Sequence, residues 1–285
     1  MLKKTFAFLA ILTAALPSMA QHSLLYKVSG NGLAQPSYLY GTVHLICEKD
    51  FNLSSQLNKA VQNSKTIYLE VDMDDPQLFL TMGPLLQNND PEYTLEKAFK
   101  PADYRKLQQF MNDSLKMDVA NFKKMKPMVL LSLMLPKMLE CRSSVSYEQK
   151  LVELAKFSNK SVEGLEDIAD QIKVFDNMPD SLEARMIMEY ISDIPKQRAM
   201  FKRLITSYKA QDIVALHDML GESPEFKGYE DILVYNRNRN WIPVMDKAMR
   251  KESTFFGVGA MHLGGDQGVI ALLKKKGYKV EAVTK

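Results

Sequence analysis

Apolar residues form short continuous or alternating runs near both ends of the chain. The runs at 24–28 and 38–40 flank a turn that contains Gly, Asn and Pro, which predicts a β-hairpin. A helix is expected at about 54–63, before a buried strand at 66–71. Residues 254–283 again predict a strand, a glycine-rich turn, a helix and a strand. Both ends of the sequence are therefore expected to contribute to a sheet.

The middle of the sequence has a different periodicity. From residue 94 to about 219 the apolar residues lie mostly three or four positions apart, which predicts several helices. We therefore predict an α+β fold, with a central mixed sheet built from two pseudo-repeated strand-GxxH-helix-strand units and a large all-helical insertion. Because the first and last segments must pair to complete the sheet, we expect a single domain. The predicted ranges are 21–285 for the domain, about 23–72 and 254–284 for the sheet parts, and about 94–250 for the helical lobe.

The first and last predicted sheet segments end in the same motif. Gly41-Thr42-Val43-His44-Leu45 and Gly259-Ala260-Met261-His262-Leu263 both read G-x-x-H-L after a strand. Glycine at a strand end allows another group to approach closely, while the imidazole stays at the edge of the sheet. If a pseudo-twofold axis relates the two units, both histidines reach one site.

Two imidazoles at strand ends indicate a divalent metal, because neutral imidazole is a common metal ligand. A hydrolytic site needs a third ligand, and Glu70, which ends an apolar strand, is the first candidate. Glu166 is the second candidate; it follows a brief extended segment that ends at Gly164. In the simpler interpretation, each histidine is a satisfied turn residue and each glutamate a helix-start cap. The repeated motif favours the metal site.

Residues 1–20 have the features of a secretory signal peptide. Lys3 and Lys4 precede an apolar run, a proline breaks the run, and Ser18-Met19-Ala20 supplies the small residues of a cleavage site. The run is too short to span a bilayer, and no later stretch is apolar for long enough. We expect the mature chain to begin at Gln21 and to be exported, either to a periplasm or out of the cell.

Composition and charge narrow the possible functions. The chain has 46% hydrophobic and 25% charged residues, which is typical of a globular protein and excludes a disordered or collagen-like one. The net charge of +3 falls to +1 when Lys3 and Lys4 are removed with the signal peptide, so nucleic acid is not an expected partner. In an oxidising compartment Cys47 and Cys141, which lack CxxC spacing, are expected to form a disulfide.

Taken together, these motifs resemble the TraB/PrgY/GumN family, part of the Tiki-like metalloprotease superfamily. The family pattern has a GTxH strand end, a later strand-ending Glu, a G-L-E segment, an R-N pair and a C-terminal G-A-x-H-L-x-G. In this sequence we match them to Gly41–His44, Glu70, Gly164-Leu165-Glu166, Arg239-Asn240 and Gly259–Gly264. The run 236–240 also contains an Arg237-Asn238 register; we choose Arg239-Asn240 from its distance to Trp241 and the last GxxH. The resemblance extends over about 37–283 and suggests an exported bacterial member.

The resemblance implies a peptidase-like hydrolase whose site binds a divalent metal such as Mn, Co or Zn. His44, His262 and one glutamate would hold the ion, and a water activated by the metal would attack a peptide or protein substrate. Whichever of Glu70 and Glu166 is not a ligand would take the proton. Arg239 or Asn240 would stabilise the oxyanion.

A second hypothesis is a catalytically silent exported protein of the same fold that captures a peptide or a polysaccharide-linked partner. The chain has 18 methionines, many of them between Met111 and Met200, and these could line an adaptable apolar groove. Methionines at helical spacing more often fill a core. Stoichiometric binding of a divalent metal discriminates between the two hypotheses.

Overall fold

A computed structural model describes residues 23–222 and 228–284. The predicted signal peptide and His22 lie outside the described residues. The strands are β1 (Leu25–Ser29), β2 (Ser37–Thr42), β3 (Ile46–Cys47), β4 (Thr66–Leu69), β5 (Ser144–Val145), β6 (Ser161–Gly164), β7 (Thr254–Gly259) and β8 (Lys279–Ala282). The α-helices are α1 (Ser55–Asn63), α2 (Leu78–Leu85), α3 (Pro101–Phe110), α4 (Pro127–Met134), α5 (Tyr147–Phe157), α6 (Ile168–Asp176), α7 (Asp180–Ser192), α8 (Ile194–Lys209), α9 (Ile213–Glu222), α10 (Asn236–Lys251) and α11 (Val269–Lys275).

A six-stranded mixed sheet forms the centre of the fold, in the order β6-β4-β7-β2-β1-β8. Strand β1 is antiparallel to both of its neighbours, whereas β6, β4, β7 and β2 run parallel. Strand β7, from the C-terminal part of the chain, lies between β4 and β2, from the N-terminal part. This arrangement confirms the predicted α+β fold and the pairing of the two ends. The inserted segment is not purely helical, because its short extended stretch forms the edge strand β6.

The sheet is covered by helices on both faces, so its central strands are apolar on both sides. Phe255 and Phe256 of β7 are adjacent in sequence, point to opposite faces and are fully buried. The Phe255 face packs against α1 and α5. The Phe256 face packs against α10 and α11. This pattern explains why β7 reads as a continuous apolar run rather than an alternating one.

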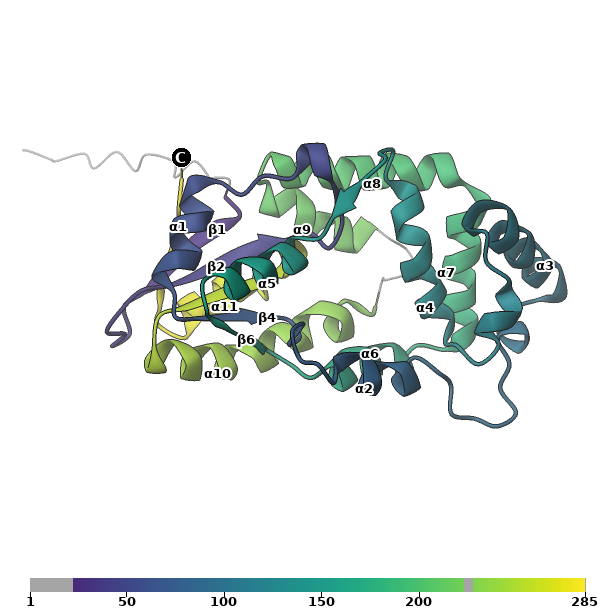
Figure 1. Cartoon of the computed structure of the whole chain (residues 1–285), viewed down its shortest axis with the longest axis horizontal. Coiled ribbons are helices and arrows are strands. Elements are labelled where there is room, and N and C mark those ends of the chain that lie inside the picture. The colour runs from purple at the N-terminus through teal and green to yellow at the C-terminus, as the bar shows by residue number, and fades with distance from the viewer. Residues whose placement is uncertain (1–22, 223–227, 285) are drawn as a thin grey trace, which may run out of the picture.

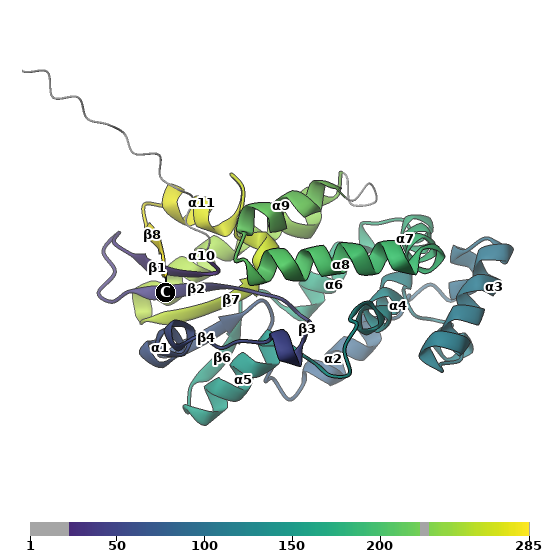
Figure 2. The same ribbon diagram turned by 90° about the horizontal axis from the view of Figure 1, so that it is seen from above.

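The helical lobe lies at the far end of the molecule from the sheet (Figure 1). Helices α3, α4 and α7 share an apolar core that includes Leu107, Leu130 and Ile187. Helix α8 runs from the lobe back to the sheet (Figure 2): Phe201 packs on the lobe core, and Tyr208 is buried in the core beneath the sheet. Five methionines fill the lobe cores instead of lining a groove: Met111, Met134, Met138, Met178 and Met186. No helix in the described part of the chain has the length and apolar character needed to cross a membrane.

A disulfide joins Cys47 to Cys141, as the sequence predicted, with the two Cα atoms 5.9 Å apart. Strand β3, which contains Cys47, pairs with β5 in a small second sheet. The crosslink closes a loop over a sequence separation of 94 residues, which contributes on the order of 4–5 kcal/mol in the chain-entropy description. Because β3 begins two residues after His44, the disulfide also restrains the loop that carries this histidine.

Glu183 of the helical lobe is buried with a backbone N–H as its hydrogen-bond donor, and among the described residues it forms no salt bridge. Glu183 on α7 is 2% exposed and accepts a hydrogen bond from the N–H of Met128, at the start of α4. Burial raises the pKa of Glu183 to about 7, with a smaller rise from Asp180, and the Met128 N–H and Lys126 oppose it. Folding therefore favours the protonated form. The contribution of protonated Glu183 to the free energy of unfolding is fully present below the ordinary pKa of 4.5. It is lost as the pH rises through about 7, the pKa of Glu183 in the folded protein.

We expect Glu183→Gln to remove this pH dependence, because glutamine keeps the acceptor oxygen and carries no charge. The free energy of unfolding of the variant should exceed that of the native protein at pH 8 by about 1–3 kcal/mol and differ little at pH 4. Urea unfolding between these pH values measures the difference. Glu96→Gln, at an exposed position of the same lobe, is the control. Parallel pH profiles for Glu183→Gln and the native protein would contradict the prediction.

Candidate functional site

Four neighbouring parallel strands end at the same edge of the sheet. In the order β6, β4, β7 and β2, they are followed by Glu166, Glu70, His262 and His44. The carboxyl ends of parallel strands form the edge at which open α/β sheets bind ligands. The fold thus brings to one edge the four residues that sequence analysis predicted as metal ligands or base.

The two histidines lie where the sheet changes its winding. After β2 the chain crosses over through α1 on one face of the sheet, and after β7 it crosses through α11 on the other face. Adjacent parallel strands whose connections leave to opposite faces define a topological switch point, where a crevice forms. His44 follows the first strand and His262 the second. The pseudo-repeat therefore has a spatial consequence: its two GxxH motifs follow the two adjacent strands of this switch point.

The glycines of the two motifs are required by close packing. A Cβ atom on Gly41 would lie 2.7 Å from Cδ1 of Leu263 and 3.1 Å from Cα of Ala260. A Cβ atom on Gly259 would lie 3.2 Å from Oε1 of Glu70. The first motif thus packs directly on the second, and the second on the glutamate.

An arginine whose side chain is only 13% exposed, Arg237, joins the two glutamates. Nη2 of Arg237 lies 2.6 Å from Oε2 of Glu70 and 2.5 Å from Oε1 of Glu166, and Nε donates a further bond of 3.0 Å to Glu166. Glu70 also accepts hydrogen bonds from the Gly259 N–H at 2.7 Å and from the Gln171 side chain at 3.1 Å. Both carboxylates are therefore fixed by charged and neutral donors.

The two carboxyl groups differ in acidity. Burial alone would raise the pKa of Glu70, but Arg237, the histidines and the Gly259 N–H lower it to about 2. For Glu166, burial and the charge of Glu70 outweigh the bonds from Arg237 and Trp241, and the pKa is raised. Glu70 is thus the firmly ionised member of the pair, and Glu166 is the one better suited to accept a proton.

His262 is buried and held in one tautomer. Its Nδ1 lies 2.6 Å from Oδ1 of Asn238, and the amide of Asn238 in turn donates to the carbonyl of Gln267 at 2.9 Å. Since the amide oxygen faces the ring, we assign the proton to Nδ1, so that Nε2 accepts a hydrogen bond from Nη1 of Arg237. Nε2 lies 4.0 Å from Oε1 of Glu70 and 3.4 Å from Nη1 of Arg237. Burial, with a smaller effect of Arg237, lowers the pKa of His262 to about 3, so the ring is neutral.

His44 is held in a similar way but is open to solvent. Its Nδ1 lies 3.0 Å from Oε1 of Glu148, and its side chain is 71% exposed, so that the other side of the ring faces water. The hydrogen bond to Glu148 raises the pKa of His44 to about 9 against the opposing effect of desolvation. Its charge also acts on Glu70 and lowers the pKa of that group. His44 is therefore electrostatically part of the site.

The donor set fits a divalent cation in its chemistry. In both histidines an oxygen acceptor anchors Nδ1, as is common in histidine metal sites, and Nε2 is the nitrogen that would face a metal. In this structure Nε2 of His262 accepts a hydrogen bond from Arg237. Glu70 adds an ionised carboxylate close to one of these nitrogens. Within residues 23–222 and 228–284, no three His, Cys, Asp or Glu side chains form a ready metal-binding group, and the cation nearest Glu70 is Arg237. The metal ligands thus stay a prediction.

The Arg-Asn register predicted from the sequence needs correction. Arg237 and Asn238 contact the site, whereas Arg239 is exposed and contacts Asp231 and Gln267. The reason is helical phase: the buried positions of α10 include Asn238 and Trp241, and Arg237 lies one turn before Trp241. Asn240 is also exposed, but it borders a hollow of about 560 Å³ that Glu166 lines.

Sequence analysis missed several residues that contact the predicted ones. Trp241 donates from its indole N–H to Glu166 at 3.1 Å and lies under the guanidinium of Arg237. Its ring also packs against His262 in a tilted arrangement, with ring centres 4.6 Å apart. Gln171 on α6 and Glu148 on α5 complete the contacts. Trp241 and Arg237 could have been found by extending the apolar spacing of α10 back by one turn. No local signal links Glu148 or Gln171 to the motifs.

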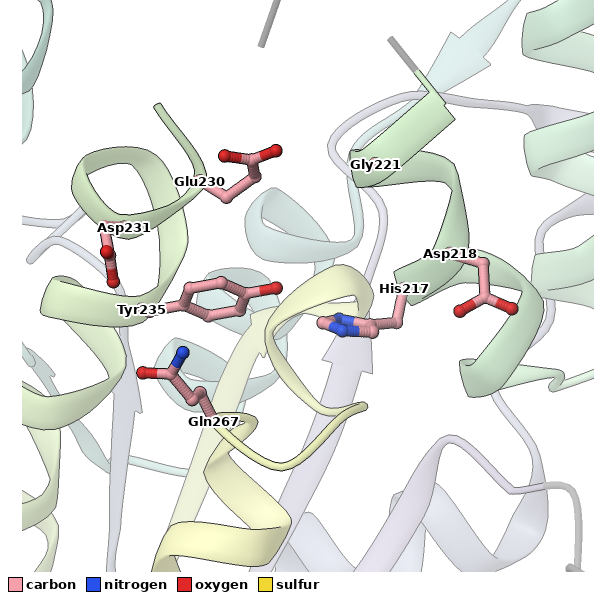
Figure 3. Close-up of a pocket in the computed structure, with 7 residues that line it drawn as sticks. All are labelled: His217, Asp218, Gly221, Glu230, Asp231, Tyr235 and Gln267. Atoms are coloured by element: carbon pink, nitrogen blue, oxygen red, sulfur yellow. The ribbon is translucent and has the colours of Figure 1, made fainter. Parts of the chain in front are cut away.

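His217 lies outside this site. It lines a separate hollow of about 310 Å³ together with Tyr235, Gln267 and three acidic residues (Figure 3). The ring is half-buried against Gly264 and Gly265, where a Cβ on Gly265 would lie 2.4 Å from Nε2. His217 therefore packs against the loop that follows His262 instead of joining the two motif histidines.

The fold and the strand-end residues define an α+β protein with a paired GxxH site at a topological switch point. The chain belongs to the TraB/PrgY/gumN family, whose profile matches residues 24–282. This match confirms the resemblance read from the motifs and covers nearly all of the described chain. Searches of curated proteins and of solved structures gave no match.

Substitutions of Arg237 and Arg239 should differ in their effect on the free energy of unfolding. Arg237→Ala should lower the free energy of unfolding by about 3–5 kcal/mol, because it leaves Glu70 and Glu166 buried without their cation. Arg239→Ala, the matched control two residues away, removes an exposed pair and should change it by less than about 1 kcal/mol. Urea unfolding at pH 7 measures both. Equal effects of the two substitutions would argue against the central position of Arg237.

Proposed function

We propose that this protein is a metal-dependent hydrolase that acts on peptide bonds. The observation that carries the proposal is the paired geometry of His44 and His262. They follow adjacent parallel strands at the switch point, and an oxygen acceptor anchors the Nδ1 of each ring. Nε2 is then the nitrogen that would bind the metal, in place of Arg237 at His262 and in place of a proton at His44. Membership of the TraB/PrgY/gumN family agrees with this proposal.

In this proposal His44, His262 and Glu70 hold a divalent ion such as Mn²⁺, Co²⁺ or Zn²⁺. Glu70 is preferred to Glu166 as the ligand because its Oε1 lies 4.0 Å from Nε2 of His262 and its carboxylate is ionised. When bound, the ion supplies Lewis acidity and lowers the pKa of a coordinated water. The chain's own contribution is to orient both imidazoles and to exclude water from the inner side of His262.

Glu166 takes the role of general base and acid. Its raised pKa makes it a better proton acceptor than the ionised Glu70, and it lines the hollow beside the site, where a substrate can approach. Arg237 is a positioning residue in this scheme, since two of its nitrogens are engaged by the glutamates and a third faces His262 and the carbonyl of Leu233. The oxyanion role stays with Asn240, whose exposed amide borders the same hollow.

A binding protein of the same fold is the alternative function. It is favoured by one observation: Arg237, rather than an arrangement of three ligands, faces Glu70 in the described residues. The buried methionines do not support the apolar groove that this alternative invoked. Under both candidate functions we propose that the protein works in an oxidising compartment after export, and the disulfide supports this.

Metal binding tests the proposal directly. After treatment with a chelator, residues 21–285 should bind Mn²⁺, Co²⁺ or Zn²⁺ stoichiometrically, with a change in the fluorescence of Trp241, the chain's single tryptophan, which packs against His262. The His44→Ala, His262→Ala double variant should lose this binding. His22→Ala, at a histidine outside the motifs, should retain it.

A screen with a mixed peptide library completes the test. We expect cleavage by the metal-loaded protein and at least a hundredfold loss in Glu166→Gln, which should still bind metal because Glu166 is not a ligand in this scheme. A folded native protein that takes up no divalent ion in elemental analysis would contradict the proposal and support the binding function.

A further inference from the structure

A third carboxylate, outside the family motifs, reaches the site from helix α5. Glu148, in the first turn of α5, is 5% exposed, and its Oε1 lies 3.0 Å from Nδ1 of His44. It is separated from His44 by more than a hundred residues of sequence. Glu148 has no role in the proposed hydrolysis, yet among the described residues it is the polar partner of the His44 ring.

Every oxygen of Glu148 is held in place. Oε1 accepts a hydrogen bond from the hydroxyl of Thr42 at 2.6 Å, and Oε2 accepts one from Ser146 at 2.7 Å. A buried carboxylate is costly unless such donors satisfy it, and these donors also fix its orientation. Thr42 is the second residue of the first GxxH motif, so the motif itself helps to hold the acceptor of its own histidine.

The position of α5 relative to His44 is fixed by the small second sheet. Ile46 of β3, two residues after His44, pairs with Val145 of β5, which lies three residues before Glu148. The disulfide from Cys47 ties the same two segments together. The strand pairing and the disulfide therefore fix the backbone segment of His44 relative to that of Glu148. The contact between the two side chains does not depend on a chance encounter of flexible groups in solvent.

We propose that Glu148 is a positioning residue that fixes the orientation of His44 and directs its Nε2 toward the site. An imidazole that is 71% exposed on a strand-end loop rotates freely unless one nitrogen is anchored. Asn238 performs the equivalent task for His262, through the same nitrogen and at a similar distance. The two GxxH histidines thus have matching anchors that come from unrelated parts of the chain, one a carboxylate and one an amide.

Nuclear magnetic resonance tests the anchor without reference to any metal. With four histidines in the chain, the ¹⁵N-bound ring protons form a small set, and the His44 signal is identified by its loss in His44→Gln. We expect a downfield proton on Nδ1 of His44 that disappears in Glu148→Ala and moves upfield in Glu148→Gln, which keeps an acceptor oxygen but no charge. Glu153→Gln, on the exposed side of the same helix, should leave it unchanged. Persistence of the signal in Glu148→Ala would overturn the proposal.

The consequence for ligand binding rests on the proposed function, because it takes His44 as a metal ligand. Loss of an anchor of this kind typically weakens metal affinity roughly 10- to 100-fold. We expect this weakening for Co²⁺ in Glu148→Ala, a smaller one in Glu148→Gln, and none in Glu153→Gln. Affinity that is unchanged in a folded Glu148→Ala variant would overturn the positioning role. If the native protein binds no Co²⁺, the proposed function fails, and the ring-proton signal alone decides whether Glu148 orients His44.

Discussion

The guanidinium group of Arg237 ties helix α10 to the ends of two paired strands of the sheet, β4 and β6. It bonds to Glu70 at the end of β4 and to Glu166 after β6, and it lies over the ring of Trp241 on its own helix, 4.9 Å from the ring centre. Two buried carboxylates at this spacing repel each other unless a cation lies between them. Arginine suits the position because its planar fork can bond to both carboxylates at once.

The strand order explains why this cluster forms next to the histidines. Because β7 inserts between β4 and β2, the end of β4 lies beside the second GxxH motif, and Oε1 of Glu70 accepts the N–H of Gly259 from that motif. The absence of a side chain on Gly259 lets the carboxylate approach the backbone, since a Cβ there would lie only 3.2 Å from the oxygen. The glutamate, the glycine and the histidine thus form one packed unit, and the geometry of the sheet edge determines the chemistry available at it.

Most of the fold was accessible from the sequence, because it depends on local periodicity and repeated motifs. The terminal strands, the crossover helices and the disulfide pair all have local or compositional signals. The phase of α10 was misjudged because residues 236–240 alternate Asn and Arg, which offers no apolar contrast; the phase becomes visible only from Trp241 onward. The contacts of Glu148 and Gln171 arise from tertiary packing between segments about a hundred residues apart, and nothing in their local sequence encodes the partner.

The charges at the sheet edge place a further constraint on the site. Glu70, Glu166 and Glu148 bring three carboxylates to a small region, whereas Arg237 is the single permanent cation that contacts them in the described residues. Burial makes such an imbalance costly, so the remaining negative charge has to be met either by protons on the glutamates and imidazoles or by a bound cation. The two routes exclude each other at His44, because a ligand atom cannot hold a proton and a metal ion together. A cation bound through His44 would therefore release the proton that the hydrogen bond to Glu148 stabilises, so Glu148 opposes metal binding through this proton while it orients the ring.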